Sequence, residues 1–185
     1  EVYEADIILK VEPPSLEELD YFKHNQCLIS ALQLKTQTAE YFKKLMDKKV
    51  TAVAFDYIKD EAHIFPIVRS MGEIAGTSSI LIAAELLSTF SGGRGLLMGG
   101  IPGVKPTRVV IIGAGTVAEY AARSALGLGA LVSVFDNSVA RLRRMQSDLN
   151  SPIATSIMQP KVLEKALKRA DVAIGALRAK EGRTP

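Results

Sequence analysis

The sequence is poor in the residues that build disulfide frameworks and metal centres. Its 185 residues contain one cysteine, Cys27, and no tryptophan. A single cysteine excludes an intramolecular disulfide and is typical of a reducing compartment, so we expect a cytoplasmic protein. The two histidines, His24 and His63, do not stand at metal-ligand spacing from each other or from Cys27, which argues against a metal site.

Long apolar runs and an excess of one charge are also lacking. No uninterrupted apolar stretch reaches the roughly 18 residues that indicate a membrane span. The net charge is +3, from 23 basic and 20 acidic residues, too little to indicate a nucleic-acid partner. The basic run 141–144 has no aromatic neighbours, so we interpret it as a solvated helix face. We therefore expect neither a membrane nor a nucleic-acid partner.

What the sequence does contain is alternating strand and helix patterns in two halves. Ten of the fourteen glycines lie between positions 92 and 129 and separate the halves. Strands that alternate with helices indicate right-handed crossovers and parallel sheets. In the first half we expect strands near 7–11, 26–32 and 51–55, a capping box at Ser15-Leu16-Glu17-Glu18 with a short helix after it, and a helix over 38–49.

The region from about Met71 to Phe90 is predicted to form a long helix that is apolar almost all round. Such a helix is buried against something. We expect it to connect the two halves, and also to form the contact between subunits of a homo-oligomer. In the second half we expect strands at 108–112, 131–135, 153–157 and 171–174, with helices over 115–128, 138–149 and 160–169.

The motif with the clearest chemistry is Gly-Ala-Gly-Thr-Val-Ala, which joins the strand ending at Ile112 to a helix. Gly113 permits the tight turn, Gly115 lets a pyrophosphate approach the backbone, and Ala118 lets helix and strand pack closely. The helix N-terminus favours the phosphate charge. Asp136, at the end of the next strand, is placed to bind the adenosine ribose hydroxyls and to repel a 2′-phosphate, so we predict NAD as the cofactor.

The substrate groups are expected where the strands of the first half end, because open α/β sheets bind ligands there. The residues at these ends are Lys10, Gln33 and Asp56. A cation at position 10 suits a substrate carboxylate, although spacing alone favours a solvated lysine at a strand end.

Four stretches then resemble the alanine dehydrogenase family, which includes the nucleotide-binding component of transhydrogenase. They are ADIILKVEPP (5–14), MGEIAG (71–76), GGRGLLMGGIPGVKP (92–106) and VVIIGAGTVAEYAA (109–122). The resemblance implies an α/β fold with two Rossmann-like parallel-sheet domains joined by a long helix. It implies oxidation of L-alanine to pyruvate and ammonium with NAD, a small amino-acid or keto-acid substrate, and a homo-oligomer.

The resemblance also assigns residues to roles. Lys10 matches the lysine that binds the substrate carboxylate, and Met71 lines the nicotinamide pocket. The family's pyrophosphate loop corresponds to Gly113, Gly115, Thr116 and Val117. Its ribose-binding acid corresponds to Asp136. A stretch that touches the cofactor ribose corresponds to Ala176 and Leu177.

Two positions depart from the family pattern. Gln33 stands where the family has its catalytic histidine, and a neutral amide cannot accept a proton. Gly72 replaces a family serine. Two alternatives therefore stay open: a catalytically impaired NAD-binding homologue with a sensor or structural role, and a transhydrogenase nucleotide-binding component.

The resemblance also predicts how the chain is divided. We expect residues 1–66 to be part of a substrate domain, 67–96 a connecting helix, and 97–185 an NAD-binding domain. The family's N-terminal arginine and catalytic aspartate have no counterpart here, so we expect a fragment in which both domains are incomplete.

Overall fold

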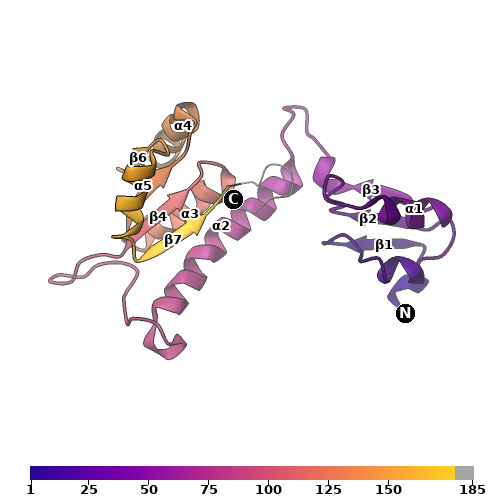
Figure 1. The fold of residues 1–185 in the computed structure, drawn as a ribbon, viewed down its shortest axis with the longest axis horizontal. Helices are drawn as coiled ribbons and strands as arrows, with labels where there is room; N and C mark the ends of the chain where they lie inside the picture. Colours follow the sequence, from indigo (N-terminus) through magenta and orange to yellow (C-terminus); the bar gives the residue numbers. More distant parts are fainter. Residues whose placement is uncertain (178–185) are drawn as a thin grey trace. The chain divides into compact units, whose positions relative to one another are not determined.

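The chain folds into two units, each built on a parallel β-sheet (Figure 1). The structure is a computed structural model, and it describes residues 1–177. The first unit is Glu1–Arg69, and the second begins at Ser70. The expected α/β class with two parallel sheets is confirmed.

The first unit contains a three-stranded parallel sheet in the order β1-β2-β3. The strand sequences are rich in isoleucine, leucine and valine, and polar turns separate them, as the pattern predicted. The capping box forms as expected, because Ser15 and Glu18 exchange backbone-to-side-chain hydrogen bonds of 2.7 and 3.1 Å. The elements are β1 (Ile7–Lys10), β2 (Cys27–Ser30), α1 (Ala39–Asp47) and β3 (Thr51–Ala54), with 3₁₀ helices at Val2–Glu4, Glu18–Tyr21 and Phe55–Tyr57.

One face of this sheet is covered and the other is open. Leu28 of strand β2 is fully buried, and it belongs to the same cluster as Tyr41 and Leu45 of helix α1. On strand β1 the side chain of Leu9 is 75% exposed, and Ile7 is exposed as well. Parallel sheets in α/β proteins are normally covered on both faces. The open face is therefore an apolar surface of this chain.

The second unit carries a four-stranded parallel sheet in the order β6-β5-β4-β7. Sequence order reverses direction between β4 and β7, so the carboxyl end of β4 is a topological switch point. The elements are α2 (Pro66–Leu87, which begins in the first unit), a 3₁₀ helix (Thr89–Ser91), β4 (Arg108–Ile112), α3 (Thr116–Gly127), β5 (Leu131–Phe135), α4 (Val139–Leu149), β6 (Ala154–Ser156), α5 (Pro160–Leu167) and β7 (Val172–Gly175).

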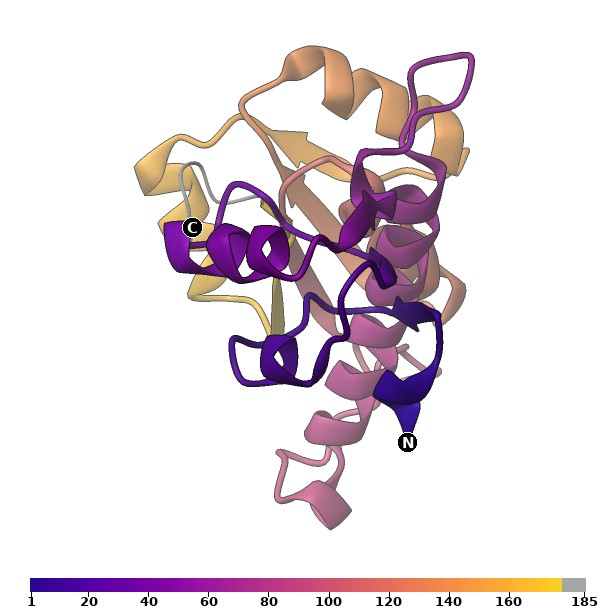
Figure 2. The same ribbon diagram turned by 90° about the vertical axis from the view of Figure 1, so that its right-hand side faces the viewer.

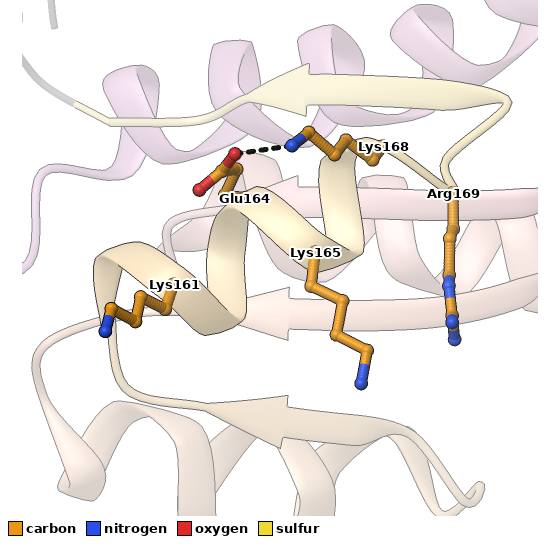
Figure 3. A pocket seen from close by; sticks show the side chains of 5 residues that line it. All are labelled: Lys161, Glu164, Lys165, Lys168 and Arg169. Carbon is orange, nitrogen blue, oxygen red and sulfur yellow. Dashed lines mark hydrogen bonds and ion pairs between the residues drawn. The ribbon is translucent and has the colours of Figure 1, made fainter.

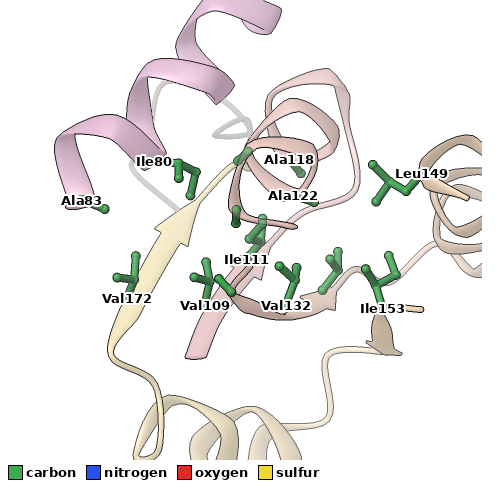
Figure 4. Packing of buried hydrophobic residues seen from close by; sticks show 14 of the residues in the cluster. Ile80, Ala83, Val109, Ile111, Ala118, Ala122, Val132, Leu149, Ile153 and Val172 are labelled. Carbon is green, nitrogen blue, oxygen red and sulfur yellow. The ribbon is translucent and has the colours of Figure 1, made fainter. Parts of the chain in front are cut away.

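The core of the second unit joins the sheet to helices α2, α3 and α4. Figure 4 shows its buried members: Ile80 and Ala83 of α2, Ala118 and Ala122 of α3, Val109 and Ile111 of β4, Val132 of β5, Leu149 of α4, Val172 of β7, and Ile153. Small residues let the helices approach closely, and in both ribbon views α2 runs alongside α3 (Figures 1 and 2). A Cβ on Gly76 would overlap the backbone carbonyl of Val117, so this crossing depends on glycine.

The connecting helix differs from its prediction. It was expected over about 71–90, within a connecting segment of 67–96. Helix α2 instead starts at Pro66 and ends at Leu87, and residues 88–96 form a 3₁₀ helix and turns. Proline suits the first position of a helix because its missing N–H has no partner there. At the other end the chain turns back on the helix, because the Leu87 carbonyl accepts the N–H groups of Gly95 and Leu96 at 2.8 and 3.2 Å.

Candidate functional site

Gly113 closes the turn after strand β4 in a conformation that needs glycine. Its φ is +116°, a region that L side chains rarely adopt. A Cβ added there would lie 2.5 Å from the carbonyl oxygen of Ala176. The Ala176 N–H donates to the Ile112 carbonyl at 2.8 Å, which ties the end of β7 to this turn. The predicted residues Gly113, Ala176 and Leu177 are thus neighbours, and the Leu177 Cδ2 is 3.4 Å from the same Cβ position.

Gly115 has a different role from Gly113. Its φ is −93°, and a Cβ would have no neighbour within 4 Å, so neither strain nor packing requires glycine. It is the N-cap of helix α3, and no side chain caps the helix there. The first N–H groups of a helix have no partner within it. Gly115, Thr116 and Val117 therefore present backbone N–H groups and open space together, which suits an anion.

Asp136 joins the glycine loop to the next strand. Its carboxylate accepts the Ala114 N–H at 2.8 Å through one oxygen and the Ser138 N–H at 2.7 Å through the other. The side chain is only 6% exposed. Each carboxylate oxygen has a second lone pair, so the group retains acceptors for two hydroxyls. The acid predicted to bind the ribose thus also holds the loop in place.

Two arginines that we interpreted as a solvated face lie at this site. The guanidinium of Arg141 is 4.0 Å from the Asp136 carboxylate, and its side chain is 61% exposed. Arg144 donates to the Ala114 carbonyl at 3.5 Å. The sequence does place these arginines close to the acid, because helix α4 begins at Val139, three residues after Asp136.

Met71 lies on helix α2 and is partly exposed. Its neighbour Gly72 approaches the start of α3, because a Cβ there would be 3.5 Å from Val117 and 3.6 Å from Thr116. The β4–α3 loop thus meets Asp136 and the end of strand β7, and Gly72 of helix α2 lies beside the start of α3.

In the first unit, Lys10 is the last residue of strand β1. Its ammonium is 2.7 Å from the Glu18 carboxylate. We predicted Lys10 as the cation for a substrate carboxylate and did not expect an acidic partner. The capping box already contains this partner in the sequence, because the Glu18 carboxylate that accepts the Ser15 N–H can also accept a hydrogen bond from Lys10.

Gln33 and Asp56 meet at the same edge of the sheet. The two Asp56 oxygens accept the N–H groups of Leu32 and Gln33, both at 3.1 Å. Gln33 adopts φ +48°, which is unusual for a residue other than glycine. Asp56 therefore fixes the turn that follows strand β2, and with it the position where Gln33 leaves the sheet.

Other features of the described part do not form a chemical centre. Within residues 1–177, no group of three histidine, cysteine or acidic side chains is arranged to hold a metal ion, and no helix is long and apolar enough to span a membrane. A surface hollow of about 360 Å³ lies on helix α5. Figure 3 shows its lining: Lys168 donates a hydrogen bond to Glu164, and Lys161, Lys165 and Arg169 lie around this pair. None of the predicted site residues lines this hollow.

Two family models divide the chain between them. Residues 1–75 match "Alanine dehydrogenase/PNT, N-terminal domain", and residues 79–185 match "Alanine dehydrogenase/PNT, C-terminal domain". The chain belongs to the alanine dehydrogenase/PNT family. Membership accounts for the two parallel-sheet units and for the glycine loop of the second.

Individual relatives agree with this family. The alanine dehydrogenase of Methanococcus maripaludis is 36% identical over 173 residues, which are 94% of this chain and 46% of that protein. A solved L-alanine dehydrogenase superimposes with a TM-score of 0.85 and 35% identity, over 99% of this chain and 50% of the other. A transhydrogenase structure from Sinorhizobium meliloti shares the fold, with a TM-score of 0.78 at 19% identity, over 100% of this chain and 53% of the other. The chain spans about half the length of the curated relatives it matches.

Proposed function

We propose that the chain is part of an NAD-dependent oxidoreductase that converts L-alanine to pyruvate and ammonium. The observation that carries the proposal is the glycine loop at the switch point of the second sheet, held by Asp136 through a 2.8 Å hydrogen bond to Ala114. Family membership supports the same reaction class. The names of the relatives support alanine as the substrate.

The residues of the second unit fit NAD. Gly115 leaves space at the start of α3, where uncapped N–H groups favour a pyrophosphate. The Asp136 carboxylate suits the two ribose hydroxyls and disfavours a 2′-phosphate. When bound, NAD supplies the hydride acceptor. The protein's contribution is to bind and orient it through Gly113, Gly115, Thr116 and Asp136.

The first unit supplies the groups for the substrate. Lys10 carries a positive charge at the end of β1 and suits the carboxylate of an amino or keto acid. Gln33 can donate a hydrogen bond to a substrate oxygen, but its amide cannot take the proton that amine oxidation releases. General-base help is worth about 10²–10⁴ in rate. We therefore expect slow turnover if no other group replaces the missing base.

Two other functions remain open. Gln33 favours an NAD-binding homologue with impaired catalysis and a sensor or structural role. The fold shared with a transhydrogenase favours a nucleotide-binding component that exchanges hydride between nucleotides without an amino acid.

We also propose a homo-oligomer, with helix α2 as the contact. Ile74, Leu81 and Leu86 of this helix are all more than half exposed, and apolar faces of this kind mark interfaces. A reducing, cytoplasmic location is part of the same proposal, because Cys27 is the chain's single cysteine.

The test is NADH formation from L-alanine and NAD by the complete gene product. Turnover is expected, and Gln33→His is expected to raise it at least tenfold. Binding of NAD without turnover in either protein would replace this proposal with the impaired homologue. Hydride exchange from NADH to an NAD analogue without any amino acid would favour the transhydrogenase component.

A further inference from the structure

The carboxylate of Glu18 is the centre of a hydrogen-bonded cluster at the end of strand β1. It accepts hydrogen bonds from the ammonium of Lys10 at 2.7 Å, from the backbone N–H of Ser15 at 2.7 Å and from the hydroxyl of Tyr3 at 2.9 Å. The three donors come from three different segments: a strand, a turn and an N-terminal 3₁₀ helix. A simple capping box would need only the bond to Ser15.

These contacts leave Glu18 little freedom to move. Its own N–H donates to the Ser15 hydroxyl at 3.1 Å, so backbone and side chain are both fixed. The ring of Tyr3 packs against Tyr21 and Phe22, with ring centres 5.7 and 5.3 Å away. The tyrosine hydroxyl therefore approaches Glu18 from a packed ring. Because the acceptor is fixed on two sides, the ammonium that it binds is fixed as well.

The negative charge of Glu18 is stable at neutral pH. The hydrogen bond from Lys10 is the main cause that lowers the pKa of Glu18 to about 2, and the Ser15 N–H adds to it. Burial and the bond to Glu18 raise the pKa of Tyr3 to about 12. Lys10 and Glu18 are 30% and 31% exposed. The Glu18 carboxylate is thus ionised, and part of the lysine side chain remains accessible.

An ammonium group has three N–H donors, and one of those on Lys10 is directed at Glu18. Within residues 1–177 the other two have no partner, so they can bind an anion if the lysine is held in place. Without such a partner, lysine is a flexible four-carbon chain that must be ordered on each binding event. A fixed carboxylate removes part of that cost in advance.

We propose that Glu18 is a positioning residue, which holds the ammonium of Lys10 so that its remaining N–H groups bind the carboxylate of the substrate. Tyr3 in turn holds Glu18. The inference rests on the proposed function, because it takes an amino or keto acid as the ligand of Lys10. It extends the substrate site to two residues that do not touch the substrate.

Kinetics of the complete gene product provide the first test, with Glu18→Gln and Tyr3→Phe. Glutamine keeps the size of glutamate but loses its charge, so KM for L-alanine should rise about tenfold, since a hydrogen bond to a charged group contributes on that scale. Tyr3→Phe should raise it less, and KM for NAD should stay unchanged in both. The matched control is Asp20→Asn, which removes another 2.7 Å ion pair, with Lys44, from the same 3₁₀ helix. An unchanged KM for L-alanine in Glu18→Gln, or an equal rise in Asp20→Asn, would overturn the inference.

The second test does not depend on turnover. Competitive acetylation followed by mass spectrometry measures the reactivity of Lys10, with Lys44 as the internal reference. Glu18→Gln should increase the reactivity of Lys10 relative to Lys44, and pyruvate should protect Lys10 in the unchanged protein. If both occur in a protein that does not oxidise L-alanine, the positioning role stands and the proposed reaction fails. If either effect is missing, the positioning role is wrong even in an active enzyme.

Discussion

The sharpest structural prediction concerns Gly113, where one added methyl group meets two separate obstacles. Its φ of +116° disfavours any residue with a Cβ, and strain of this kind costs roughly 1–3 kcal/mol. The added Cβ of Gly113→Ala would also lie 2.5 Å from the Ala176 carbonyl oxygen and 2.9 Å from its carbon. Overpacking against backbone adds about 1–3 kcal/mol. Together the two effects predict a loss of roughly 2–6 kcal/mol from the second unit.

Hydrogen exchange, resolved peptide by peptide, is the suitable assay, because the first unit serves as an internal reference. Protection should fall in β4, α3 and β7 and stay unchanged in β1–β3. The matched control is Gly127→Ala at the end of α3, where a Cβ meets nothing within 4 Å and φ is not positive. That change should leave stability the same or slightly higher. Equal protection in Gly113→Ala and Gly127→Ala would refute the reasoning.

Three further predictions follow from the geometry. Gly76→Ala should destabilise the contact between α2 and α3, because its Cβ would overlap the Val117 carbonyl; exchange in α2 reports it, and Gly127→Ala is again the control. Leu28→Ala, at a fully buried site, should lower the free energy of unfolding in urea by about 2–5 kcal/mol. Leu9, on the neighbouring strand, is 75% exposed, so Leu9→Thr should leave stability nearly unchanged and reduce the binding of an apolar dye. Equal losses of stability in the two variants would contradict the open sheet face. Because the pKa of Glu18 is lowered to about 2 from 4.5, its contribution to stability is complete above pH 4.5 and disappears as the pH falls through 2, so the acid limb of the unfolding curve should be shallower in Glu18→Gln.

Most of the fold could be predicted because the apolar runs are bounded by clear signals. Strands β4 and β5 form over the predicted residues, 108–112 and 131–135, since each is a mostly apolar segment with a turn at its end. Helix α2 was harder to delimit. It is apolar nearly all round, so its periodicity does not mark either end, and it starts at Pro66, five residues before the expected start at Met71.

The site could be predicted as a set of residues but not as a set of contacts. Asp136 was expected from its position after β5, whereas its bond to Ala114 depends on how two loops meet in space. The partners of Lys10 and Arg141 were missed for the same reason. The capping box and the start of helix α4 mark Glu18 and Arg141 as groups near the site, but tertiary structure decides which side chains they contact.

The central claim is that the second unit binds NAD through the loop at Gly115, and calorimetry on this chain tests it most directly. A methyl group at Gly115 meets no protein atom within 4 Å, so Gly115→Ala should leave stability unchanged. It would occupy the space assigned to the pyrophosphate, and NAD affinity should therefore fall at least tenfold. Unaltered NAD affinity in Gly115→Ala, or no NAD binding by the unchanged chain, would contradict the account.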